Sequence, residues 1–164
     1  MPSHDQLNAP IEPIGRAYDF DLHALRTSGR SEDEIVRVIS SIRSEFDCFV
    51  IDRLGGAVTG WQPIISAVAE CVSGWVEVFG SEAEAIHDAI DQASVKLGRQ
   101  QALGDGDPMT GWDSKMNDAE LAHYISTGGQ GECSLKLVMY FAKGQEEDSF
   151  FDELRRCLLW RKSR

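Results

Sequence analysis

The sequence predicts a mainly α-helical fold, a single-domain bundle of about five to six helices with room for one or two short strands. Two serines that each precede a glutamate by three residues are the first reason, at Ser31 and Ser81. This spacing forms a capping box, in which each side chain bonds a backbone N–H of the first helical turn. Helical spacing of apolar residues between positions 35 and 50 is the second reason. A helix is therefore expected from residue 32 to a glycine end at Gly55 and Gly56.

The length of 164 residues fits one domain. Three of the five prolines lie at positions 2, 10 and 13, so residues 1–16 are expected to form a flexible arm and residues 17–164 one helical domain. Tyr18, Phe20 and Leu22 alternate with polar residues, which predicts a short strand or extended segment.

The segment from Trp61 to Phe79 is nearly uncharged, and we expect a central helix over residues 62–79. A third helix is expected from the capping box at Ser81 to about residue 97, followed by a surface loop over residues 104–115. Asn117 is predicted to cap a short helix, and a last helix is predicted over residues 147–160. Residues 132–142 fit both a strand and a helix, and helix is favoured.

Composition and charge limit the classes of function. The net charge is −11, and no lysine or arginine lies between Arg53 and Lys96, so direct binding of nucleic acid is not expected. A membrane span over residues 61–79 is not expected either, because Glu70 falls at its centre. Four dispersed cysteines without a metal-binding spacing, and a first segment unlike a secretory signal, predict a cytoplasmic protein with free thiols.

The uncompensated acidic interval leads to the main functional hypothesis, a non-catalytic protein that engages a basic protein partner through an acidic helical face. Small acidic immunity proteins and inhibitors that mimic nucleic acids use the same physics, and the comparison rests on charge and size alone. The expected contact residues lie on the second and third predicted helices and the loop after them: Glu70, Glu77, Glu84, Asp88, Asp91, Asp105, Asp107, Trp112 and Asp113.

The alternative hypothesis is a small metal-binding helical bundle with enzymatic activity. The pattern Glu-x-x-His occurs twice, as Glu84 with His87 and as Glu120 with His123, and it places both side chains on one helix face, as in di-metal bundles. Glu84 and Glu120 are also the third residues of predicted caps, and this simpler reading is preferred.

No other motif names a reaction or a cofactor. The run Gly128-Gly129-Gln130-Gly131 lacks the lysine and hydroxyl of a phosphate-binding loop, and no Gly-x-Ser-x-Gly element is present. We therefore nominate no catalytic residue and expect no cofactor.

Overall fold

The computed structural model describes residues 11–55, 58–98, 110–142 and 145–163, and it shows an α/β fold in place of the predicted helical bundle. Its described residues form a six-stranded sheet in the order β1-β2-β6-β3-β4-β5. The strands are β1 (Ile11–Ala17), β2 (Phe20–Arg26), β3 (Phe46–Asp52), β4 (Val76–Gly80), β5 (Thr110–Asp113) and β6 (Leu135–Phe141). All neighbouring pairs are parallel except β1 with β2.

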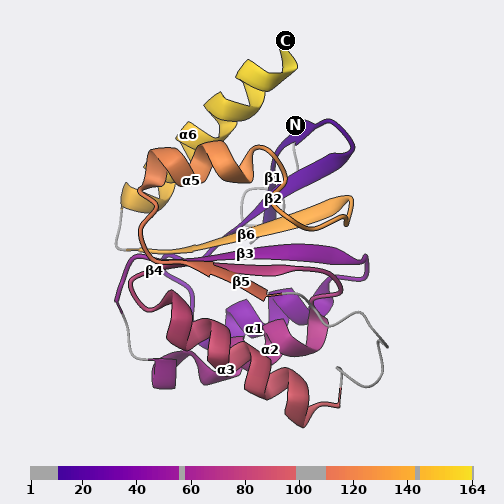
Figure 1. The fold of residues 1–164 in the computed structure, drawn as a ribbon, viewed down its shortest axis with the longest axis vertical. Helices are drawn as coiled ribbons and strands as arrows, with labels where there is room; N and C mark the ends of the chain where they lie inside the picture. Colours follow the sequence, from indigo (N-terminus) through magenta and orange to yellow (C-terminus); the bar gives the residue numbers. More distant parts are fainter. Residues whose placement is uncertain (1–10, 56–57, 99–109, 143–144, 164) are drawn as a thin grey trace.

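Helices cover both faces of the sheet (Figure 1). On one face lie α1 (Glu32–Ser41), α2 (Gln62–Cys71), which follows the short helix η1 (Val58–Trp61), and α3 (Ala83–Lys96). The opposite face carries α5 (Asp118–Ile125) and α6 (Gln145–Lys162). Two apolar cores result, one between the sheet and α1, α2 and α3, and one beneath α5 and α6. No helix among the described residues is long and apolar enough to cross a membrane.

The prediction of a mainly helical fold was wrong because three apolar segments are strands. Residues 46–52, placed in the first helix, form β3, and α1 ends at Ser41. The expected helix over residues 62–79 is α2 followed by β4, and residues 132–142 contain β6. All residues of β3 and β4 are buried, as is usual where helices cover a parallel sheet on both faces. Such strands lack the alternation that distinguishes a strand from a buried helix.

Predictions that rested on short local patterns, such as helix caps, were more accurate than the predicted fold class. Ser31 caps α1 by accepting a hydrogen bond from the Glu34 N–H, and Asn117 and Glu120 form a complete capping box at α5. The expected short strand corresponds to β2, and the last predicted helix corresponds to α6. The box at Ser81 is absent, since the N-cap of α3 is Glu82 and has no side-chain hydrogen bond. Residues 11–16, expected within the arm, belong to β1, which pairs with β2.

The order of the strands creates a switch point between β3 and β6. From β3 the chain moves outward through β4 to β5, with α2 and α3 on one face, and then returns along the other face through α5 to β6. The helices that follow β3 and β6 consequently lie on opposite faces of the sheet. In open α/β sheets a crevice forms beyond the carboxyl ends of the strands at such a point.

A buried ion pair joins these two central strands near their amino ends. Lys136 Nζ lies 2.6 Å from Asp47 Oδ2, and both side chains are 3% exposed. Further donors on the Asp47 carboxylate are the backbone N–H of Trp75 and that of Cys133. Lys136 also donates to the Gly131 carbonyl at 2.7 Å. The pair is thus saturated with hydrogen bonds, as a buried charge requires.

Removal of one partner should be more harmful than removal of both. We expect Lys136→Met to lower the free energy of unfolding by about 3–5 kcal/mol, because it leaves the Asp47 carboxylate buried without a counter-charge. Asp47→Asn combined with Lys136→Met should be less destabilising than the single change, as measured by urea denaturation, because the amide oxygen still accepts from a backbone N–H and the unpaired charge is gone. Equal losses in the single and double variants would contradict the assignment of this pair as a coupled unit.

Candidate functional site

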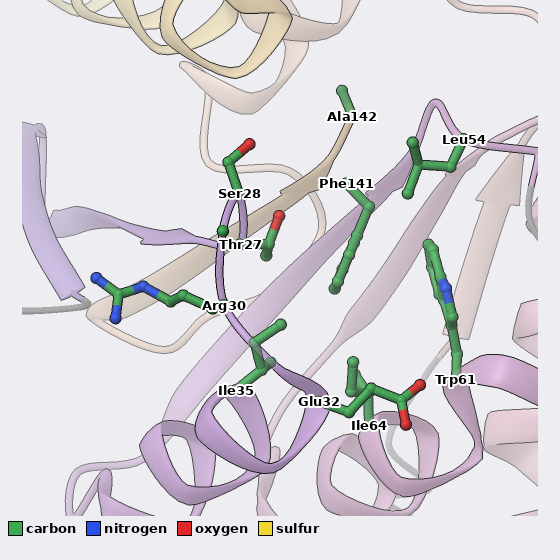
Figure 2. Close-up of a pocket in the computed structure, with 11 residues that line it drawn as sticks. Thr27, Ser28, Arg30, Glu32, Ile35, Leu54, Trp61, Ile64, Phe141 and Ala142 are labelled. Carbon is green, nitrogen blue, oxygen red and sulfur yellow. The ribbon is translucent and has the colours of Figure 1, made fainter. Parts of the chain in front are cut away.

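A cleft of about 610 Å³ lies at the switch point, beyond the carboxyl ends of β2, β6 and β3 (Figure 2). Thr27, Ser28, Gly29, Arg30 and Glu32 line it from the end of β2 and the start of α1, Leu54 and Trp61 from the segment after β3, and Phe141 and Ala142 from the end of β6. Ile35 of α1 and Ile64 of α2 complete the lining. Three separate parts of the chain, around residues 27–35, 54–64 and 141–142, therefore meet at one position in the fold.

An aromatic pair forms one wall of this cleft. The ring centroids of Trp61 and Phe141 are 4.3 Å apart, with 37° between the ring planes. In Figure 2 both rings face the same gap as Ile35 and Ile64, whereas the Arg30 side chain extends away from it. Trp61 comes directly before α2, and Pro63 in the first turn of that helix has no N–H that needs a partner. The wall offers an apolar surface suited to a flat ring.

The opposite wall is polar and is fixed by α6. Glu147, which is 2% exposed, accepts hydrogen bonds from the backbone N–H groups of Thr27 and Ser28, at 3.2 and 2.9 Å. Thr27 Oγ1 donates to the carbonyl of Tyr140 in β6 at 2.6 Å. These contacts hold the end of β2 against β6 and α6, so this wall is rigid before any ligand arrives.

A row of residues across the sheet connects the cleft to a buried carboxylate. Arg26 of β2 is in register with Tyr140, so the following positions, Thr27 and Phe141, are neighbours. Asp52, at the end of β3, is the register partner of Phe141 on one side and of Gly80 on the other. Asp52 is 1% exposed, and its neighbour Phe141 belongs to the cleft wall.

Asp52 has one satisfied oxygen and one without a partner. Oδ1 accepts a hydrogen bond from the Leu54 N–H at 2.9 Å, whereas Oδ2 is buried and has no hydrogen-bond partner within the described part of the chain. Burial raises the pKa of the Asp52 carboxyl, the nearby Glu82 carboxylate adds to the rise, and backbone hydrogen bonds from Leu54 and Gly55 oppose it. A buried carboxyl group of this kind can accept from a ligand or exchange a proton with it.

The structure brings some of the predicted contact residues together. Glu70 on α2, and Glu84, Asp88 and Asp91 on α3, lie on two helices that cover the same face of the sheet. Glu70, Glu84 and Asp88 are exposed, and the Asp91 side chain is 41% exposed. His87 lies between two of them, 3.2 Å from Asp88 and 3.7 Å from Asp91.

Other predicted contact residues lie elsewhere. Glu77 is in β4 rather than in a helix, is 6% exposed, and is covered by α5, whose Tyr124 hydroxyl donates to it. Burial raises the pKa of the Glu77 carboxyl. Trp112, 46% exposed, and Asp113 belong to the edge strand β5. Asp105 and Asp107 fall outside the described residues.

The two Glu-x-x-His pairs are separated by the sheet. Glu84 and His87 belong to α3, whereas Glu120 and His123 belong to α5 on the opposite face. The described residues contain no group of three or more histidine, cysteine, aspartate or glutamate side chains placed to hold a metal ion. Glu120 instead accepts the Asn117 N–H at 2.9 Å, which is the capping role that the sequence also predicted.

Sequence reasoning did not find the residues of the cleft. Asp52 stands at the end of an apolar run and before Arg53, and a carboxylate in this position is a usable signal only once that run is recognised as a parallel strand. Thr27 and Phe141 carry no local signal, because their proximity depends on the pairing of β2 with β6.

The perturbed carboxyl group gives a pH-dependent prediction. Because the pKa of Asp52 is raised in the native state, that state holds more protons than the unfolded chain as pH rises above the ordinary aspartate value, and stability falls there. Asp52→Asn retains the Oδ1 acceptor and should remove this loss. We expect the difference in free energy of unfolding between the variant and wild type, measured by urea denaturation, to shift in favour of the variant as the pH rises from acidic to neutral. The exposed Asp19→Asn is the control, and a relative gain by wild type with rising pH would contradict the assignment.

Comparisons with known proteins assign no family. No family model matches the chain, and no curated protein matches it in sequence. Among solved structures, the chain is similar to UDP-N-acetylmuramate-alanine ligase from Thermotoga maritima, with 10% identity and a TM-score of 0.49. The similarity covers 91% of this chain but only 29% of that enzyme.

Proposed function

We propose that this chain binds a small organic molecule with a flat apolar ring in the cleft at the switch point. The main support is the position of the aromatic pair Trp61 and Phe141, which lies in a cleft of about 610 Å³ beyond the carboxyl ends of the parallel strands. Clefts in this position and of this size are the usual ligand sites of α/β sheets. The exposed hydroxyl group of Ser28 on the facing wall would orient the ligand.

A ring-binding cleft predicts a site-specific loss of affinity. In a screen of ring-containing fragments by ligand-observed NMR, we expect hits that shift the backbone amides of Ser28, Gly29 and Ile64. Trp61→Leu should weaken their binding by roughly three- to tenfold, because stacking on the indole is lost. Trp160→Leu, an equivalent change at a tryptophan on α6, should leave affinity unchanged. Hits that shift only amides outside the cleft, or equal losses in the two variants, would refute the proposal.

A second function is favoured by a separate observation, the charge of the surface formed by α2 and α3. We propose that Glu70, Glu84, Asp88 and Asp91 form an acidic surface that engages a basic protein partner. Support comes from their place on two adjacent helices and from the lack of any lysine or arginine between Arg53 and Lys96. Electrostatic complementarity of this kind chiefly accelerates association.

The acidic surface can be tested through salt dependence. Proteins captured by the immobilised chain would be purified, and their association rate measured by surface plasmon resonance at increasing ionic strength. We expect the rate to fall by about tenfold or more with added salt. At low salt, the variant with Glu70→Gln, Glu84→Gln, Asp88→Asn and Asp91→Asn should associate more slowly than wild type by a similar factor.

The matched control changes four exposed carboxylates outside this surface to their amides: Asp19, Glu45, Glu132 and Glu146. It alters the net charge by the same amount, so a local effect predicts that it retains most of the wild-type rate. A rate that is independent of salt, or equal in the two variants, would rule out this surface as the recognition site.

A reducing compartment such as the cytoplasm suits either function. All four cysteines are free, and none is exposed: Cys48 is buried, and Cys71, Cys133 and Cys157 are partly buried. Burial raises the pKa of the Cys133 thiol to about 11, so this group stays protonated and unreactive at neutral pH.

A further inference from the structure

The neighbours of Asp52 connect its unpartnered oxygen to the cleft. Phe141, its register partner in β6, and Leu54, whose N–H bonds Oδ1, both line the cleft. Parallel register partners project to the same face, so the Asp52 carboxylate and the Phe141 ring lie side by side. On the other side of Asp52 its register partner is Gly80, where a Cβ atom would lie 2.0 Å from the Asp52 carbonyl oxygen. Asp52 does not itself line the cleft, but its sheet neighbour Phe141 and its hydrogen-bond partner Leu54 do.

The charges around the cleft favour a cationic ligand. Glu32 lines it, and Glu82 is close enough to raise the pKa of Asp52. The nearest arginines have acidic partners: Arg53 lies 2.8 Å from Asp118, and Arg30 lies 3.9 Å from Glu34. A phosphate or carboxylate would therefore meet mainly negative charge, whereas an ammonium group would neutralise it.

The aromatic wall is compatible with the same ligand class. A cation near the face of a tryptophan or phenylalanine ring is attracted by the negative face of the ring, in addition to the carboxylate. A ligand with an aromatic ring and a nearby ammonium group would use both features of the site, the ring stacking on Trp61 and the ammonium reaching Asp52.

We propose that the cleft selects a small aromatic amine whose ammonium group donates a hydrogen bond to Asp52 Oδ2. This inference rests on the proposed small-molecule function and specifies its ligand class. The ammonium group passes Leu54, whose side chain is 42% exposed and can turn outward without leaving a core position. The exposed Ser28 hydroxyl then remains available for a polar group at the other end of the ligand.

Three compounds that share a phenyl ring and a two-carbon linker test the selectivity. Phenethylamine carries an ammonium group, phenethyl alcohol a neutral hydroxyl, and hydrocinnamate a carboxylate. Affinities for the full chain would be measured by NMR titration of the amides of Ser28, Gly29 and Ile64. We expect the amine to bind about tenfold or more tightly than the alcohol, the gain typical of a charge-assisted hydrogen bond, and hydrocinnamate to bind most weakly.

Asp52→Asn should reduce the affinity for the amine to that for the alcohol, whereas Asp19→Asn should preserve the preference. If Asp52→Asn does not fold, the pH dependence of binding to the wild-type protein provides an independent test. Amine affinity should rise from acidic to neutral pH as Asp52 ionises, with release of a proton on binding, and alcohol affinity should not.

Equal affinities for the amine and the alcohol, or an amine preference that survives Asp52→Asn, would overturn the role of Asp52 and leave the ring-binding cleft intact. Failure of all three compounds to shift the cleft amides would also overturn it. The broader proposal fails only if the fragment screen likewise finds no ring compound in the cleft.

Discussion

The ion pair between Asp47 and Lys136 ties together the two central strands of the sheet. These residues are 89 positions apart in the chain, and β6, the last strand in the sequence, lies between β2 and β3 in the sheet. The packing around the pair allows no side chain at two nearby glycines. A Cβ atom on Gly74 or Gly131 would lie within 2.1 Å of the Asp47 carboxylate. Gly131, from the glycine run that does not match a phosphate-binding loop, thus has a structural role beside a buried charge, as does Gly74.

The insertion of β6 at this place has consequences at the other end of the sheet. It puts Phe141 beside Asp52 and Thr27 beside Phe141, so that an aromatic ring, a buried carboxyl group and a hydroxyl group share one row. It also sends the helices after β3 and β6 to opposite faces, which leaves the carboxyl ends of these strands uncovered by a crossing helix. The amino end of the sheet is closed by saturated polar contacts, and the carboxyl end contains a cleft and an unpartnered oxygen within the described residues.

The acidic surface of α2 and α3 and the cleft lie on the same side of the sheet but have different chemistry. The cleft is lined largely by apolar and aromatic side chains, whereas the outward residues of the two helices are carboxylates. Glu77 shows why spacing alone could not define this surface. It was expected on the same helix as Glu70, over residues 62–79, but α2 ends at Cys71 and Glu77 belongs to β4 beneath α5.

The sequence alone determined the features that depend on neighbours in the chain: the caps of α1 and α5, the position of β2 and α6, and an interval without positive charge. It did not determine whether the apolar segments at 46–52, 76–80 and 135–141 are strands or helices, because a segment buried on both faces has no polar side to reveal its period. Nor could it locate the cleft, since Thr27, Asp52 and Phe141 come together only through strand pairing between distant segments. That pairing is stabilised by burial and by a charge pair whose partners become neighbours only in the folded chain.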